Sequence, residues 1–307
     1  MKKMLAVLAC VVFGALLAAP QAVQSQQEKA AEYEVKVIRD VVYKTVDGIE
    51  LKLNLFLPQR DGKTRENAPL LMNIDAGCWY SGNPGNGGQW QNFRAVQKGF
   101  AVASVPHRSA KQFPFPAQIE DAKAAVRFLR AHAEEYGLDK SRFACMGYSS
   151  GGHISNMLGI PDEVKVFDVG ENLDQSSQVQ CVINFYGPTD IAYFLRNNPS
   201  VDCIYQVCGG KMEDGKVSHE LTDELLATAA KCSPITYVTK DSSPSLHFYG
   251  VMDRVVPISQ GCMLYEAQWE AGVRTQLYIS NTGVHSVGTI ASTEELAKMV
   301  FDFLGWE

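Results

Sequence analysis

Three residues in the second half of the chain have the types and spacing needed for nucleophilic catalysis. Ser149 lies in GYSSG (147–151), which matches the G-x-S-x-G pattern and stands between an apolar run and a helical segment. A serine nucleophile needs a general base and an acid to orient that base. We predict that His285, in YISNTGVHS, is the base and that Asp253, in LHFYGVMDRVVP, is the acid.

Other residues compete for these roles. Asp190, in FYGPTDI, also follows an apolar run, but it precedes a helical segment, where a carboxylate usually serves as an N-cap. His153 follows the serine too closely in its helix to face back easily, so we expect it to pack or cap locally. The remaining histidines fall on a helix, a strand, an insertion or a loop that could border the pocket: His107, His132, His219 and His247.

The oxyanion of an acyl transfer intermediate needs backbone N–H donors. We predict that these are the amides of Gly77 and Cys78, in NIDAGCWYSGN, together with that of Ser150. Trp79 either packs beneath this loop or lines the pocket, and Trp79 and Tyr148 are the candidate substrate-binding residues. This chemistry requires no cofactor, and without a C-x-x-C pair we expect no structural zinc site.

The elements that must position these residues can be read from hydrophobic periodicity. Residues 33–45 and 49–58 alternate apolar and polar around Asp47-Gly48, which indicates an antiparallel hairpin. Short continuous apolar runs then alternate with helical segments, the pattern of a mostly parallel α/β sheet covered by helices on both faces. These runs are residues 69–75, 99–106, 142–147, 179–187, 245–250 and 275–280. We predict one domain over residues 34–307, with a lid-like insertion at 191–233.

The N-terminus has the charge and hydropathy pattern of a secretory signal peptide. Two lysines precede an apolar stretch at 4–19, and small and polar residues follow, so we expect cleavage after Ser25, with a polar leader at 26–33. Cleavage removes two lysines and no acidic residue, which takes the net charge from −6 to −8. This charge argues against nucleic acid and anionic lipid as partners. We expect a secreted or periplasmic protein that does not insert into a membrane after cleavage. The sequence does not indicate its oligomeric state.

Seven of the eight cysteines follow the expected cleavage site, so at least one is free or bonded between chains. Cys145 and Cys181 lie in apolar runs and are expected to be core residues. Cys203 and Cys208, with Cys232 nearby, are the best candidates for a bridge.

Three segments resemble the α/β-hydrolase family: GYSSGGHIS, FYGPTDI and SPITYVTKDSSPSLHFYGVMDRVVP. The resemblance runs from about residue 34 to the C-terminus and is greatest to bacterial esterases grouped with hormone-sensitive lipase and with acetylxylan and feruloyl esterases. It implies an α/β-hydrolase fold and a serine esterase that works through an acyl-enzyme. It also implies acetyl or hydroxycinnamoyl esters of plant polysaccharides as substrates.

The chain departs from that family at the oxyanion loop. Where the family usually has His-Gly-Gly-Gly-Trp, residues 75–79 are DAGCW, and the family's Tyr-Arg and His-Gly become residues 107–108 and 249–250. The Asp75 carboxylate would destabilise the oxyanion if the carboxylate pointed toward it. If the carboxylate instead turned away and accepted hydrogen bonds from loop amides, it would hold the loop in place. Two alternatives follow: a peptidase or small-amide hydrolase with the same triad, and a catalytically disabled binding protein on a hydrolase scaffold.

Overall fold

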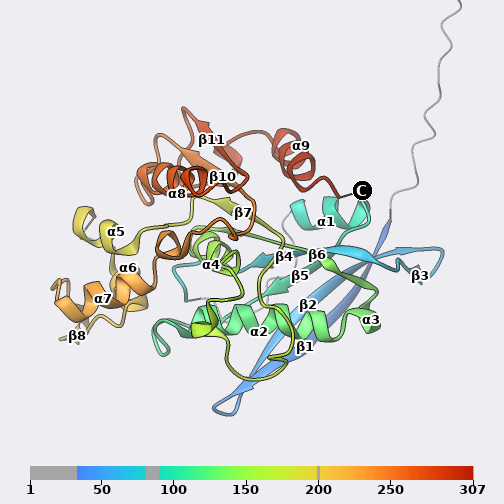
Figure 1. Ribbon diagram of the computed structural model, residues 1–307, viewed down its shortest axis with the longest axis horizontal. Coiled ribbons are helices and arrows are strands. Elements are labelled where there is room, and N and C mark those ends of the chain that lie inside the picture. Colours follow the sequence, from blue (N-terminus) through green and yellow to red (C-terminus); the bar gives the residue numbers. More distant parts are fainter. Residues whose placement is uncertain (1–32, 81–89, 199–200, 307) are drawn as a thin grey trace, which may run out of the picture. The chain divides into compact units, whose positions relative to one another are not determined.

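The chain folds around one large mixed sheet. The computed structural model describes residues 33–80, 90–198 and 201–306, so the expected signal peptide lies outside the described residues. The sheet has the order β1-β2-β5-β4-β6-β7-β10-β11, with the short β3 paired to β2 (Figure 1). Its strands are β1 (Glu34–Val46), β2 (Ile49–Arg60), β3 (Lys63–Thr64), β4 (Ala68–Ile74), β5 (Ala101–Val105), β6 (Leu138–Tyr148), β7 (Cys181–Phe185), β10 (Ser245–Gly250) and β11 (Thr275–Ser280).

The N-terminal strands form the predicted antiparallel hairpin. Val46 of β1 pairs with Ile49 of β2 across Asp47-Gly48, and both turn residues have positive φ, 51° and 77°. Asp-Gly favours this left-handed turn because glycine has no Cβ to clash there. From β4 to β11 all neighbouring strands pair in parallel. This arrangement confirms the predicted α/β-hydrolase fold.

Helices cover both faces of the parallel region (Figure 1). On one face, Leu71, Met146 and Phe185 meet the apolar side of α9 (Thr293–Leu304), and Phe100 packs on Phe301 with ring centroids 5.4 Å apart. On the other face, the Cys145 thiol donates a hydrogen bond to the Ser155 carbonyl of α4 (Ser150–Leu158) at 3.4 Å. Cys145 and Met146, adjacent residues of β6, thus point to opposite faces of the sheet, as the pleat of a strand requires.

The other helices complete these two layers and the connections between them. Their bounds are α1 (Trp90–Gln97), α2 (Ala117–Ala131), α3 (Ala133–Tyr136) and α8 (Ser259–Glu270), with the 3₁₀ turns η1 (Lys165–Phe167), η2 (Pro234–Tyr237) and η3 (Val287–Thr289). Among the described residues, no helix is both long enough and apolar enough to span a bilayer.

The segment 191–233 departs from the strand–helix alternation, as the sequence indicates. It contains α5 (Ile191–Asn197), α6 (Asp202–Val207), the two-residue strands β8 (Met212–Glu213) and β9 (Lys216–Val217), and α7 (Asp223–Lys231). Figure 1 shows these elements gathered at one end of the domain, beyond α4 and α8. Its role as a lid remains a prediction.

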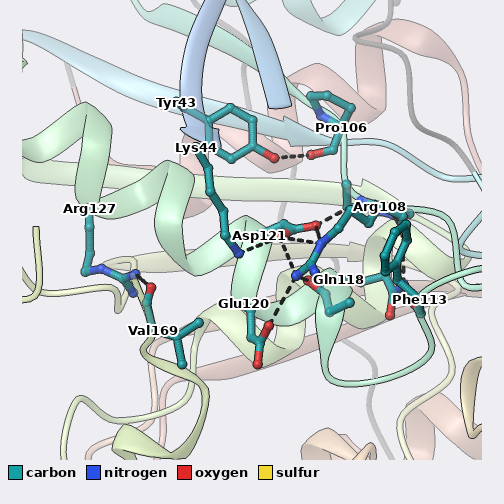
Figure 2. Close-up of polar contacts among 12 residues, drawn as sticks. Tyr43, Lys44, Pro106, Arg108, Phe113, Gln118, Glu120, Asp121, Arg127 and Val169 are labelled. Carbon is teal, nitrogen blue, oxygen red and sulfur yellow. Dashed lines mark hydrogen bonds and ion pairs between the residues drawn. The ribbon is translucent and has the colours of Figure 1, made fainter. Parts of the chain in front are cut away.

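A buried ionic network fixes the loop that follows β5 (Figure 2). Asp121 of α2 is fully buried and accepts hydrogen bonds from Lys44 Nζ at 2.7 Å and from Arg108 Nε at 2.9 Å. Arg108 also contacts Glu120 at 3.2 Å, and the Tyr43 hydroxyl donates to the Pro106 carbonyl at 2.7 Å. Removing either partner of such a buried pair leaves an uncompensated charge. The network therefore ties the hairpin, the β5 loop and α2 into one unit.

Candidate active site

The turn at Ser149 is built by glycine contacts on both of its sides. Ser149 has φ 52° and ψ −122°, a strained conformation, at the junction of β6 and α4. A Cβ on Gly147 would lie 2.2 Å from the Gly151 carbonyl oxygen, and one on Gly151 would lie 2.5 Å from that of Ile74. The glycines around the serine are therefore required by close backbone approach, as the sequence pattern predicts for a nucleophile elbow.

Asp253 and His285 come from two neighbouring loops and meet side chain to side chain. His285 Nδ1 donates to Asp253 Oδ2 at 2.7 Å. The other carboxylate oxygen, Oδ1, accepts the amides of Val255 at 2.8 Å and Val256 at 3.0 Å. The Asp253 side chain is fully buried, whereas that of His285 is 21% exposed. The acid is thus fixed on both oxygens, and its partner imidazole reaches solvent.

Backbone contact between two glycines brings these two loops together. A Cβ on Gly250, at the end of β10, would lie 2.1 Å from the Gly283 carbonyl oxygen. The Met252 amide donates to that same carbonyl at 3.0 Å, and the Val251 amide donates to the Ser280 carbonyl at 2.9 Å. Because β10 and β11 run parallel, both loops leave the same edge of the sheet.

Ser149 and His285 each contact a residue at the end of β7. The Ser149 amide donates to the Phe185 carbonyl at 2.9 Å, and the next residue, Tyr186, has its ring 4.6 Å from the His285 ring. Within the described residues no hydrogen bond joins Ser149 Oγ to the imidazole. Catalytic hydrogen bonds of this kind often tighten only when substrate binds.

The predicted oxyanion loop has an unusual backbone. Gly77, Cys78 and Trp79 have φ of 97°, 59° and 58° in succession. Positive φ is uncommon for non-glycine residues and costs on the order of 1–3 kcal/mol each, so the surroundings must hold it. The Tyr80 amide donates to the Gly77 carbonyl at 2.9 Å, which closes the turn. Across from this loop, Ser150 begins α4, so its amide has no acceptor within the helix.

Trp79 anchors the loop from below. Its side chain is 2% exposed, and Nε1 donates to His153 Nδ1 at 3.1 Å. His153 Nε2 in turn donates to the Cys232 carbonyl at 2.7 Å, and burial lowers the pKa of His153 to about 4, so the ring is neutral. The Ala110 amide donates to the Trp79 carbonyl at 2.8 Å and thereby links the loop to the Arg108 segment. Of the two roles expected for Trp79, packing beneath the loop is the one observed, and its role as a substrate-binding residue stays a prediction.

The other residues considered from the sequence make contacts that support the fold. Asp190 caps α5 by accepting the Tyr193 amide at 2.8 Å. His247 is buried in β10, where Nε2 bonds to Gln268 at 2.9 Å. Tyr148 is buried and stacks on Phe185, with centroids 4.7 Å apart. Sequence reasoning did not identify His153 as the anchor of Trp79, because its partners are 74 and 79 residues away.

Asp75 lies close to the hairpin. Burial raises the pKa of the Tyr43 hydroxyl, and the charges of Asp121 and then Asp75 raise it further. The Asp75 amide donates to the Val105 carbonyl at 3.1 Å, and its own carbonyl lies against Gly151. The carboxylate is therefore within electrostatic reach of the Tyr43 phenol.

Comparison with known proteins places this chain in a family. The family model BD-FAE matches residues 53–268. The carboxylic ester hydrolase LipM of Mycobacterium tuberculosis, which carries the qualifier "probable", is 27% identical over 193 residues, 63% of this chain and 43% of LipM. Esterase LipQ of the same organism is 26% identical over 247 residues, 78% of this chain and 55% of LipQ. The chain spans about half the length of the curated relatives it matches.

Two solved structures are similar over most of the chain. A truncated carbohydrate esterase from gut microbiota has TM-score 0.72 and 25% identity, covering 90% of this chain and 99% of that one. A bifunctional GH43-CE protein of Bacteroides eggerthii also has TM-score 0.72, with 31% identity, covering 88% of this chain and 38% of that one. The chain belongs to the BD-FAE family.

Proposed function

We propose that the chain is an exported serine esterase that hydrolyses carboxylic esters, with acetyl or hydroxycinnamoyl groups on plant polysaccharides as its substrates. The observation that carries the proposal is the 2.7 Å hydrogen bond between His285 Nδ1 and the buried Asp253, beside the strained turn of Ser149. The carbohydrate esterases of similar structure support the substrate class. The N-terminal signal pattern supports export.

The proposed reaction uses each group once in acylation and once in deacylation. Ser149 Oγ attacks the ester carbonyl while His285 Nε2 takes its proton, and the imidazolium then protonates the leaving alcohol. Asp253 keeps Nδ1 protonated and stabilises the imidazolium. Water, deprotonated by His285, attacks the acyl-enzyme and releases the acid.

The developing oxyanion is proposed to accept hydrogen bonds from the amides of Gly77, Cys78 and Ser150. Ser150 also places the positive end of the α4 dipole at this point. Preorganised donors of this kind are typically worth about 10²–10³-fold in kcat each. The positive φ values at residues 77–79 are the strain through which the loop would hold its amides in place.

Hydrolysis of 4-nitrophenyl acetate tests the serine mechanism. We expect turnover that disappears in Ser149→Ala and persists in the matched control Ser155→Ala, whose hydroxyl is buried without a hydrogen-bond partner among the described residues. A labelled fluorophosphonate should modify Ser149, and acetylated and feruloylated xylan fragments should then rank the substrates. Equal background rates in wild type and Ser149→Ala, with no fluorophosphonate labelling, would refute the proposal.

A further inference from the structure

Four cysteines meet in two pairs around α6. The side chain of Cys203 interacts with that of Cys78, an exposed free cysteine of the oxyanion loop. The side chain of Cys232, at the end of α7, interacts with that of the buried Cys208, and its Sγ also lies 3.5 Å from His153 Nε2. Each contact joins segments that are distant in sequence.

The position of the cysteines on α6 explains this pairing. Cys203 and Cys208 are five residues apart, a rise of roughly 7.5 Å along a helix, which exceeds the Cα separation of about 7 Å that a disulfide can span. A turn of 100° per residue also points them in different directions. Each is therefore left to a partner on another element.

A second contact holds the oxyanion loop against α6. The Tyr80 hydroxyl donates to Gln206 Oε1, one turn along α6 from Cys203. The Phe115 amide donates to the Val207 carbonyl at 2.8 Å, which fixes the end of the helix against the segment before α2. The approach of Cys78 to Cys203 is thus supported by neighbouring bonds on both elements.

We propose that Cys78 and Cys203 are a disulfide-forming pair that locks the oxyanion loop to α6. The consequence for catalysis rests on the proposed function, whereas the cross-link itself does not. The bond would fix the middle residue of the three with positive φ, and so hold a backbone that is costly to maintain without tertiary support.

The surroundings of Cys78 suit it to start the exchange. The interaction with Cys203 lowers the pKa of the Cys78 thiol, against the opposing effect of burial, and the charge of Lys111 adds to the lowering. A lowered pKa increases the thiolate fraction at neutral pH, and the thiolate is the form that attacks a disulfide. Cys203 keeps its proton, since the bond to Cys78 and burial raise its pKa.

The exchange balances with a small disulfide such as oxidised glutathione as the oxidant. The Cys78 thiolate attacks one glutathione sulfur, forms a mixed disulfide and expels a glutathione thiolate. Cys203 then loses its proton to solvent and attacks the Cys78 sulfur, which expels the second glutathione thiolate. Two protein thiols are oxidised to one disulfide, and one glutathione disulfide is reduced to two thiols.

Non-reducing peptide mapping tests the pairing directly. The chain without residues 1–25 is incubated with oxidised glutathione, its free thiols are alkylated, and it is digested at acidic pH and analysed by mass spectrometry. We expect a peptide that links Cys78 to Cys203, lost in Cys203→Ser and retained in the matched control Cys262→Ser, an exposed cysteine on α8. Alkylated Cys78 and Cys203 after oxidation, or a link from Cys78 to another cysteine, would overturn the proposal.

Thermal unfolding gives a second readout. Oxidation should raise the Tm of the wild type by roughly 5–10 °C, and Cys203→Ser should lose this increase. Ester turnover is measured in the same samples. A confirmed link in a protein without esterase activity would refute only the proposed function, while turnover without the link would refute only the cross-link.

Discussion

The two halves of the candidate site are held in place by different kinds of contact. On the side of Ser149, Asp253 and His285, the loops pack backbone against backbone through glycines, with Gly147 on Gly151 and Gly250 on Gly283. On the oxyanion side, the loop is held by side chains, through Trp79 on His153, Tyr80 on Gln206 and Cys78 on Cys203.

This difference separates what is rigid from what can be modulated. Glycine contacts between backbones do not titrate or oxidise, so these contacts are independent of pH and redox state. The oxyanion loop depends on a buried imidazole and on thiols, whose chemistry changes with pH and redox state. We therefore expect substitutions in the first half to act on the chemical step or the fold, and those in the second half to act in a graded way.

The largest effect on kcat is expected at Asp253, the proposed acid of the first half. Asp253→Asn should lower kcat by about 10⁴-fold while the fold persists, because the amide favours the wrong imidazole tautomer. Asp190→Asn is the matched control, since Asp190 only caps α5 and its replacement should leave turnover near wild type. Steady-state kinetics with 4-nitrophenyl acetate and circular dichroism measure both. If Asp190→Asn shows the larger loss, Asp190 is the acid.

The glycine contacts themselves can be broken next. Gly250→Ala places a Cβ 2.1 Å from the Gly283 carbonyl oxygen, so the acid and histidine loops must move apart. A displacement of about 1 Å can cost roughly 10²-fold in rate, and we expect a loss of this size in kcat together with a lower Tm. Gly288→Ala, in the same region with open space around its Cβ, is the control. Wild-type kinetics in Gly250→Ala would show that the close approach does not position His285.

Much of the first half is predictable from sequence, because its determinants are local. The G-x-S-x-G spacing between a strand and a helix forces the turn at Ser149, and the loops after two parallel strands bring Asp253 and His285 to one edge. The second half depends on pairs such as Trp79 and His153, which are 74 residues apart. Local patterns carry no information about such a pair, so the sequence left two roles open for Trp79 and assigned His153 no partner.

Acid should weaken the protein through its buried histidines. Burial lowers the pKa of His153 and of His247 to about 4, below the ordinary value of 6.5. Between pH 6.5 and pH 4 the unfolded chain therefore binds more protons than the folded chain does. The stability that is present above pH 6.5 is lost as the pH falls toward 4. At pH 5 the loss is about 2 kcal/mol per histidine in the free energy of unfolding.

Urea unfolding at pH 7 and pH 5 measures this loss. His153→Gln, which keeps a donor and an acceptor but does not titrate, should have a pH dependence shallower by about 2 kcal/mol. An unchanged pH dependence in this variant would mean that His153 is not the titrating anchor of the oxyanion loop.

A smaller effect is expected when the Trp79 anchor loses its hydrogen bond. Trp79→Phe leaves His153 Nδ1 buried without its donor, at a cost of about 1–3 kcal/mol. We expect kcat to fall by about 10-fold with little change in KM, because the proposed donors of the loop would contact the oxyanion chiefly in the transition state. Trp269→Phe, at a 66% exposed tryptophan of α8, is the matched control. A change in KM alone would point instead to a role in substrate binding.

The smallest effect is expected at Asp75, and it distinguishes the two roles open to that carboxylate. Its charge contributes to raising the pKa of Tyr43, which places it near the hairpin. Asp75→Asn keeps the size of the side chain and removes its charge. We expect kcat to change by less than about twofold and the Tm to fall slightly, because substitutions outside the core usually change the free energy of unfolding by no more than about 0.5 kcal/mol. An increase in kcat of about 10-fold, weaker at high salt, would instead mean that the carboxylate opposes the oxyanion.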